Sequence, residues 1–147
     1  MTYTMVARRY IVSRLAGDPV LVGHGITGVY AAGELPDDAE YPFVVMDVVS
    51  PFTAIPDGQA RPLLGTGRMV VRAVYETDDM ETVEPAAARI SELLGHQVNQ
   101  PIPGGGELVV CHYVSDFDSP QTDPRPYRSL GAIFRMQVAV PAFAEVP

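Results

Sequence analysis

The chain has 147 residues, a formal net charge of −8 and ten basic residues, all of them arginine. This length predicts a single domain over residues 1–147. The acidic balance argues against a nucleic-acid-binding protein, because such proteins neutralise phosphates with Lys and Arg. The single cysteine, Cys111, excludes an internal disulfide and a metal site built from several cysteines. No apolar run approaches the about 18 residues of a membrane span, and we expect no signal peptide.

The first third of the chain predicts one helix and two strands. Apolar side chains recur every four residues along Tyr3–Leu15, as in an amphipathic helix, and Gly17 with the following proline ends it. Residues 20–32 are punctuated by glycine, with Val29–Ala31 as the expected strand. Residues 43–49 form a nearly continuous apolar run of strand length.

One charge lies inside this apolar run. A covered carboxylate without a partner costs several kcal/mol, so we expect Asp47 to pair with Arg68 or Arg72 on the neighbouring strand. Asp47→Ala should then lower thermal stability more than Asp57→Ala, because Asp57 lies in a predicted loop.

The middle of the chain predicts a long loop, a strand and a second helix. Residues 50–67 hold three prolines and show no sustained periodicity, which indicates a loop. Residues 68–75 alternate between apolar and polar side chains, as in a strand with one buried face. Apolar residues repeat at steps of three and four along Met80–Leu94, and Asp78 with Glu81 resembles a capping box at the start of this helix.

The last third predicts two strands separated by a second long loop. Residues 108–114 and 130–140 are the strands, the latter with clean alternation, and residues 115–128 form a loop rich in proline and aspartate. The order of elements lacks regular βαβ alternation. It predicts an α+β fold, with two helices packed on one face of a largely antiparallel four- to five-stranded sheet.

Catalytic and cofactor motifs are weak. Residues 23–28 fit the pattern G-x-G-x-x-G, but Gly33 and Pro36 follow too soon for the helix that a dinucleotide site needs, so we interpret the stretch as a glycine-rich turn. Cys111 and His112 are neighbours on a predicted strand and therefore point to opposite faces. A buried thiol that acts as a small apolar group is the expected role of Cys111.

Three loop aspartates, Asp116, Asp118 and Asp123, lack the ordered spacing and the terminal Glu of a calcium loop. They are expected to serve turns or to meet an arginine of a partner. The three scattered histidines form no i, i+4 pair. We therefore expect no catalytic residues, no metal and no cofactor, and a protein that is not an enzyme.

The order and spacing of these elements resemble the tail terminator (tail completion, or minor tail) proteins of long-tailed bacteriophages. The similarity spans the helix Tyr3–Leu15, the stretch Tyr41-Pro42-Phe43-Val44-Val45, the alternating residues 68–75, the helix Met80–Leu94 and the closing residues 130–140. Tyr-Pro-Phe-Val is its most local marker.

This resemblance implies a structural virion protein, located at the neck of the tail and assembled in the host cytoplasm. Such a protein forms a homo-oligomeric ring, usually a hexamer, that binds the end of the tail tube, ends polymerisation and offers a surface to the head-side connector or stopper protein. DNA would pass through the channel without specific binding. The net charge of −8 motivates the hypothesis of an acidic channel wall that reduces the sticking of DNA, and a charged outer surface for solubility explains the same charge equally well. No membrane partner is implied.

The two long loops, at about 50–67 and 115–128, and the exposed face of the last strand are the expected contact regions. The side chains that we expect at these interfaces are Phe52, Arg61, Arg68, Asp116, Asp118, Arg125, Arg128 and Arg135.

Three other functions stay open at this point. One is another neck protein, a head-completion or stopper subunit, which differs in the neighbour that it touches. A second, from a different class, is a small enzyme that uses Cys111 or the Asp116, Asp118 and Asp123 loop. The third is a generic binding module with a cellular α+β fold.

Overall fold

The computed structural model describes residues 2–55, 63–77, 79–121 and 127–140, which form three helices and six strands. Among these helices, none is both long and apolar enough to cross a membrane. In chain order the elements are α1 Tyr3–Leu15, α2 Pro19–Gly23, β1 Val29–Ala31, β2 Phe43–Ala54, β3 Leu63–Tyr75, α3 Met80–Leu94, β4 Gln97–Pro101, β5 Glu107–Gln121 and β6 Tyr127–Val140.

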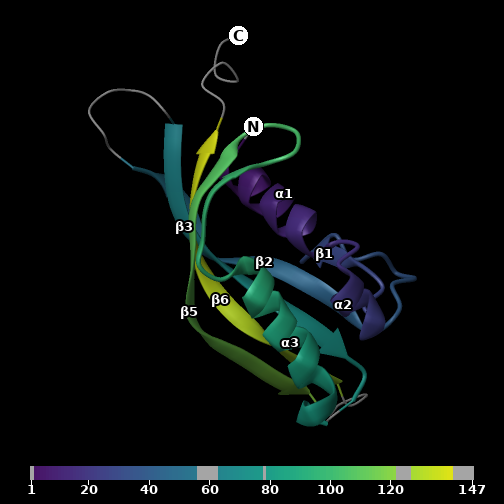
Figure 1. Ribbon diagram of the computed structural model, residues 1–147. Helices are drawn as coiled ribbons and strands as arrows, with labels where there is room; N and C mark the ends of the chain where they lie inside the picture. Colours follow the sequence, from purple (N-terminus) through teal and green to yellow (C-terminus); the bar gives the residue numbers. More distant parts are fainter. Residues whose placement is uncertain (1, 56–62, 78, 122–126, 141–147) are drawn as a thin grey trace.

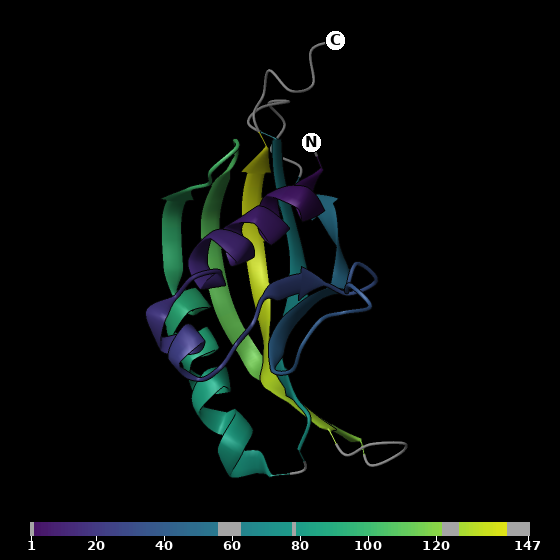
Figure 2. The same ribbon diagram turned by 90° about the vertical axis from the view of Figure 1, so that its right-hand side faces the viewer.

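All six strands belong to one mixed sheet in the order β1-β2-β3-β6-β5-β4. The short β1 runs parallel to β2, and every other neighbouring pair is antiparallel. The sheet curls into a half-barrel around helices α1 and α3, which lie on its concave side (Figures 1 and 2). Register shifts in the β2–β3 and β5–β6 ladders contribute to this curvature, because an extra residue on one strand bends it and increases its twist.

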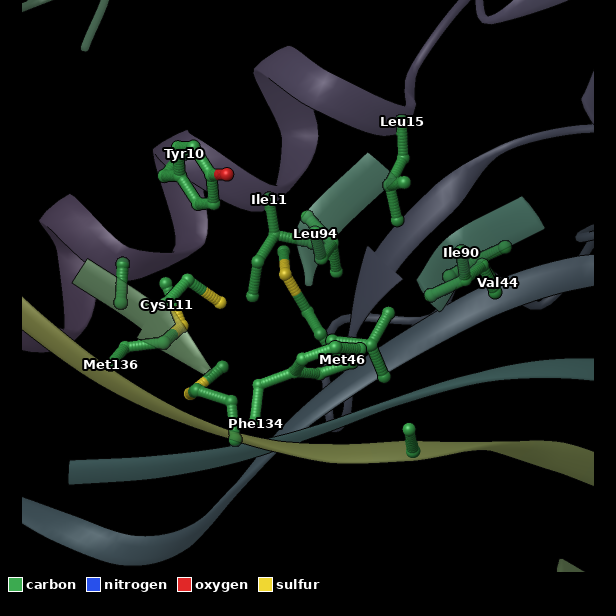
Figure 3. Packing of buried hydrophobic residues seen from close by; sticks show 14 of the residues in the cluster. Tyr10, Ile11, Leu15, Val44, Met46, Ile90, Leu94, Cys111, Phe134 and Met136 are labelled. Carbon is green, nitrogen blue, oxygen red and sulfur yellow. The ribbon is translucent and has the colours of Figure 1, made fainter. Parts of the chain in front are cut away.

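The main core fills the space between the two long helices and the concave face. Tyr10 and Ile11 of α1 are buried against Cys111, Phe134 and Met136 of β5 and β6 (Figure 3). The stripe predicted for α1 is confirmed, and so are the bounds of the helix. Its first turn is capped by the Thr2 hydroxyl, which accepts the Met5 N–H at 3.1 Å.

Helix α3 also has the predicted bounds, and its buried residues follow the predicted spacing of three and four. Its N-cap is Asp79, whose carboxylate accepts the Glu81 N–H at 3.1 Å. The capping box that we expected from Asp78 is therefore wrong in position, and Asp78 itself lies outside the described residues.

A second, smaller apolar cluster lies on the convex face near the β1 edge. It consists of Phe43, Val45 and Val74, with Tyr30 and Ala39 packed against it. The loop between β1 and β2 therefore covers part of the convex face, which explains why residues 43–46 are buried on both sides of the sheet.

The expected fold class is wrong, because the sheet has six mixed strands and three helices accompany it. Two elements gave no sequence signal, because α2 has only five residues and β4 is polar. The strand predicted at Val29–Ala31 is confirmed as β1, but its parallel pairing with β2 depends on tertiary context. The loop expected at residues 50–67 is partly strand, since β2 continues to Ala54 and β3 begins at Leu63.

The loop expected at residues 115–128 is also largely strand, since β5 continues to Gln121 and β6 begins at Tyr127. Both loop predictions were wrong because the prolines in these segments indicated loops. Pro51 lies where the β2–β3 register is irregular, a position where a strand tolerates the missing N–H.

Candidate interaction surfaces

The eight predicted interface residues do not form one surface. Arg61 and Arg125 lie outside the described residues. The other six occupy three separate places: a cleft beside α3, a row across the convex face, and a packed position at the end of β2.

The cleft lies between α3, the C-terminal half of β5 and the N-terminal half of β6, and it has a volume of about 390 Å³. Its floor is apolar, and its acidic lining comes from Glu84 on the helix and from Asp116 and Asp118 on β5. Both aspartates, predicted as loop residues, therefore stand on a strand and face the helix.

The two cleft aspartates have partners within the chain. Asp118 accepts two hydrogen bonds from Arg128, at 2.7 Å from Nη2 and 3.1 Å from Nε, in a bidentate ion pair across β5 and β6. Asp116 accepts a hydrogen bond of 2.7 Å from the Tyr113 hydroxyl, and this bond to a carboxylate raises the pKa of Tyr113. The partner that we expected for these aspartates is therefore supplied in part by the chain itself.

Arg68 and Arg135 stand directly opposite one another on the convex face. They are register partners in the β3–β6 ladder, and His112 of β5 is the register partner of Arg135 on its other side. All three side chains are exposed. We call this three-strand feature the basic row. Its alignment follows from the sheet register, which sequence alone did not provide.

A neighbouring arginine on the same face is held within the sheet. Arg72 lies with its guanidinium carbon 5.5 Å from the centre of the Phe117 ring, and its Nη1 donates to the buried Ser129 hydroxyl at 3.3 Å. A Cβ at Gly131, the register partner of Arg72, would overlap the Val71 carbonyl oxygen, so the two strands approach closely here.

Asp47 does not make the predicted pair with Arg68 or Arg72. Its carboxylate is exposed and accepts its neighbour's Val48 N–H at 2.8 Å. No ion pair between described residues includes it. The prediction of burial was wrong because the convex face is open to solvent at this position.

Phe52 is half-buried and belongs to the core. A Cβ at Gly67 would lie 2.7 Å from the Phe52 ring, so the glycine of β3 leaves the space that this ring fills. The described structure therefore gives Phe52 a packing role within the chain.

The candidate catalytic groups come together nowhere in the described residues. Cys111 is fully buried, and burial raises the pKa of its thiol to about 12, whereas His112 is exposed on the opposite face. Gly23 ends helix α2, and residues 24–28 lead into β1, so this stretch opens no helix. No group of three or more His, Cys, Asp or Glu side chains in the described ranges is arranged to hold a metal ion, and Asp123 lies outside those ranges.

Comparison with known proteins identifies a fold relative. Neither a protein-family model nor a curated protein matches the sequence. A chain in a solved structure described as the virion of a native gene transfer agent (GTA) particle has a similar fold, with a TM-score of 0.71 and 18% sequence identity. The match covers 94% of this chain and 99% of that chain. The two chains therefore share one fold over nearly their whole lengths.

Proposed function

We propose that the chain is a structural subunit of a phage-like virion, and that it acts there as a tail terminator. In this role several copies form a ring, six by the resemblance described above, that binds the end of the tail tube and ends its polymerisation. The same ring offers its other side to the head-side connector. The chain contributes shape and contact surface in this function, without catalysis.

The observation that carries this proposal is the match over 94% of the chain to the fold of a chain from a GTA virion. It agrees with the resemblance described above as far as a structural protein of a phage-like virion. The described surfaces fit a subunit that contacts neighbours: the basic row, the acidic cleft and an acidic loop, residues 34–40 between β1 and β2, lie on separate parts of a net acidic chain. A head-to-tail ring requires two different patches of this kind on each subunit.

The test is assembly with purified components. The chain would be mixed with preformed tail tubes from the same virion, and the tubes would be examined by electron microscopy and by co-sedimentation. We expect a ring at one end of each tube and no further growth when tube protein is added. A chain that leaves tube growth unchanged and never binds a tube end would refute the role.

A stopper or head-completion subunit is the second candidate, because the described fold relative comes from a whole virion without a stated layer. Parallel pull-downs separate the two roles. Capture of the portal-side adaptor without capture of tail tube protein would favour the stopper, and the reverse would favour the terminator.

A further inference from the structure

We propose that the basic row, Arg68, Arg135 and His112, receives the acidic loop of residues 34–40 from a second copy of the chain. This inference rests on the proposed ring, and it names the two patches that make the contact between adjacent subunits. In an isolated subunit the basic row is electrostatically unfavourable.

Like charges directly opposite on neighbouring strands destabilise a sheet. Arg68 and Arg135 are such a pair, and the exposed His112 imidazole stands beside Arg135 on the next strand. No ion pair between described residues includes Arg68 or Arg135. The carboxylates on this face at Asp47 and Glu107 stand directly opposite Val70 and Ala139, and no ion pair between described residues joins either of them to the row. The arrangement is unfavourable in a lone subunit and becomes favourable when an acidic surface covers it.

The acidic loop has the complementary charge and is held ready for contact. Two turns order it, closed by the Glu34 N–H to the Ala31 carbonyl at 3.0 Å and by the Ala39 N–H to the Pro36 carbonyl at 3.1 Å. The second turn places Asp37 and Asp38 at its tip. Ala39 packs against the apolar cluster on the convex face and anchors the loop to the sheet.

The carboxylates of this loop are available. Asp37, Asp38 and Glu40 are exposed, and none of the ion pairs between described residues involves them. Glu34 makes a long pair with Arg8 at 3.7 Å. By contrast, the cleft aspartates already hold Arg128 and Tyr113. The tip of a turn can also reach the exposed sheet face of another subunit more easily than carboxylates that line a cleft can.

The two patches are placed for a head-to-tail contact. In Figure 1 the middle of β3, β5 and β6, which carries the row, lies at the left, and the loop that joins β1 to β2 lies at the right. One subunit can therefore offer its loop to one neighbour and its row to the other. A contact of this type is heterologous and closes into a ring when the rotation allows.

Charge reversal tests the contact. One variant carries Arg68→Glu with Arg135→Glu, a second carries Asp37→Arg with Asp38→Arg, and a third carries all four substitutions and so keeps the wild-type net charge. Native mass spectrometry and sedimentation give the oligomeric state. We expect each double variant to lose the ring, the fourfold variant to regain it, and a mixture of the two double variants to form rings with alternating subunits.

Two controls guard the interpretation. Glu81→Arg with Glu107→Arg raises the net charge by as much as Asp37→Arg with Asp38→Arg does. Both sites are exposed and lie outside the two patches, so this variant should keep the ring. Arg135→Gln should weaken the ring while leaving the melting temperature of the subunit unchanged or higher, because it removes the repulsion with Arg68. A variant that lost the ring through misfolding would melt at a lower temperature instead.

The outcomes separate this inference from the proposed function. If both double variants still form the ring that the wild type forms, the proposed contact is wrong, while the role at the tail end is unaffected. Failure of the fourfold variant to restore assembly overturns the pairing of row and loop. Wild-type chain that stays monomeric at every concentration, alone and with tail tubes, overturns both. If Arg68→Glu with Arg135→Glu abolishes binding of a labelled DNA duplex but leaves the ring intact, the row is a phosphate site and the inference fails.

Discussion

Asp18 and Arg89 join helix α2 to helix α3 through a bidentate ion pair. The Arg89 Nη2 and Nε atoms donate to the two carboxylate oxygens at 2.8 and 3.0 Å, and the Asp18 side chain is only 7% exposed. The same carboxylate accepts the Leu21 N–H at 3.1 Å and caps α2. The ion pair therefore connects the short helix to the main body of the fold. These hydrogen bonds, led by that from Arg89, lower the pKa of Asp18.

We predict a pH-dependent loss of stability in Asp18→Asn. Because the folded-state pKa is lowered, the carboxylate stabilises the fold above its unfolded pKa, about 3.9, and this contribution disappears as the pH falls through the lower folded value. Asn keeps an acceptor for the Leu21 N–H. The variant should therefore lose about 1–2 kcal/mol near neutral pH, and the difference from the wild type should disappear as the pH falls through the lowered folded-state pKa of Asp18.

Urea denaturation across this pH range measures the effect, and Asp47→Asn is the matched control. Asp47 is exposed and has no ion-pair partner among the described residues, so its substitution should change stability by less than about 0.5 kcal/mol. Equal losses in the two variants would contradict the role assigned to the Asp18–Arg89 pair.

Gly131→Ala should destabilise the fold by about 2 kcal/mol or more. The added methyl group would meet the β3 backbone at Val71 and Arg72, which cannot withdraw without opening the ladder. Gly23→Ala is the control, because Gly23 ends a helix and nothing lies within 4 Å of its added Cβ. Thermal unfolding of both variants checks the prediction, and similar melting temperatures would disprove the close approach.

Cys111 should resist thiol reagents in the native protein. The side chain is fully buried, and a pKa of about 12 leaves almost no thiolate near pH 8. Labelling should appear only on unfolding, and Cys111→Ala should cost about 1 kcal/mol through the space that it leaves. Reaction of the folded chain at the rate of a free thiol would show that the cysteine is accessible and would revive an enzymatic role.

The ion pair between Asp118 and Arg128 should contribute little to folding. Its carboxylate is 35% exposed, and pairs of this exposure give about 0–1 kcal/mol. A double-mutant cycle with Asp118→Asn and Arg128→Gln should therefore yield a small coupling free energy. If the same single variants reduce binding to tail tubes well beyond that value, the cleft is a contact surface.

Local patterns in the sequence predicted the two long helices well, because each has an apolar stripe of helical spacing and a polar residue at its start. The alternation of residues 68–75 and 130–140 likewise predicted their buried faces. These features depend on neighbours within a few positions of one another. The local sequence is therefore sufficient to predict them.

What the sequence did not reveal depends on contacts between distant segments. Strand β5 continues through Pro120 because it pairs with β6, and the polar strand β4 forms because it pairs with β5. The stability of these pairings depends on contacts between segments that are distant in the sequence. The sequence predicts both Arg68 and Arg135 at an interface, but only the register of the β3–β6 ladder shows that they stand opposite one another. The acidic residues of the loop at 34–40 carry no distinctive sequence signal, because charged residues are common in surface loops.

The register shift in β5 after Tyr113 decides the chemistry of two surfaces at once. Uninterrupted alternation would turn Phe117 toward α3 and present Asp116 and Asp118 to the outside. The single additional residue inverts that phase, so the carboxylates enter the cleft and the aromatic ring meets Arg72. Deleting Val114 would therefore remove the bulge and still leave Asp116 and Asp118 in the cleft, whereas a register that paired Val114 regularly would move both carboxylates to the outer face.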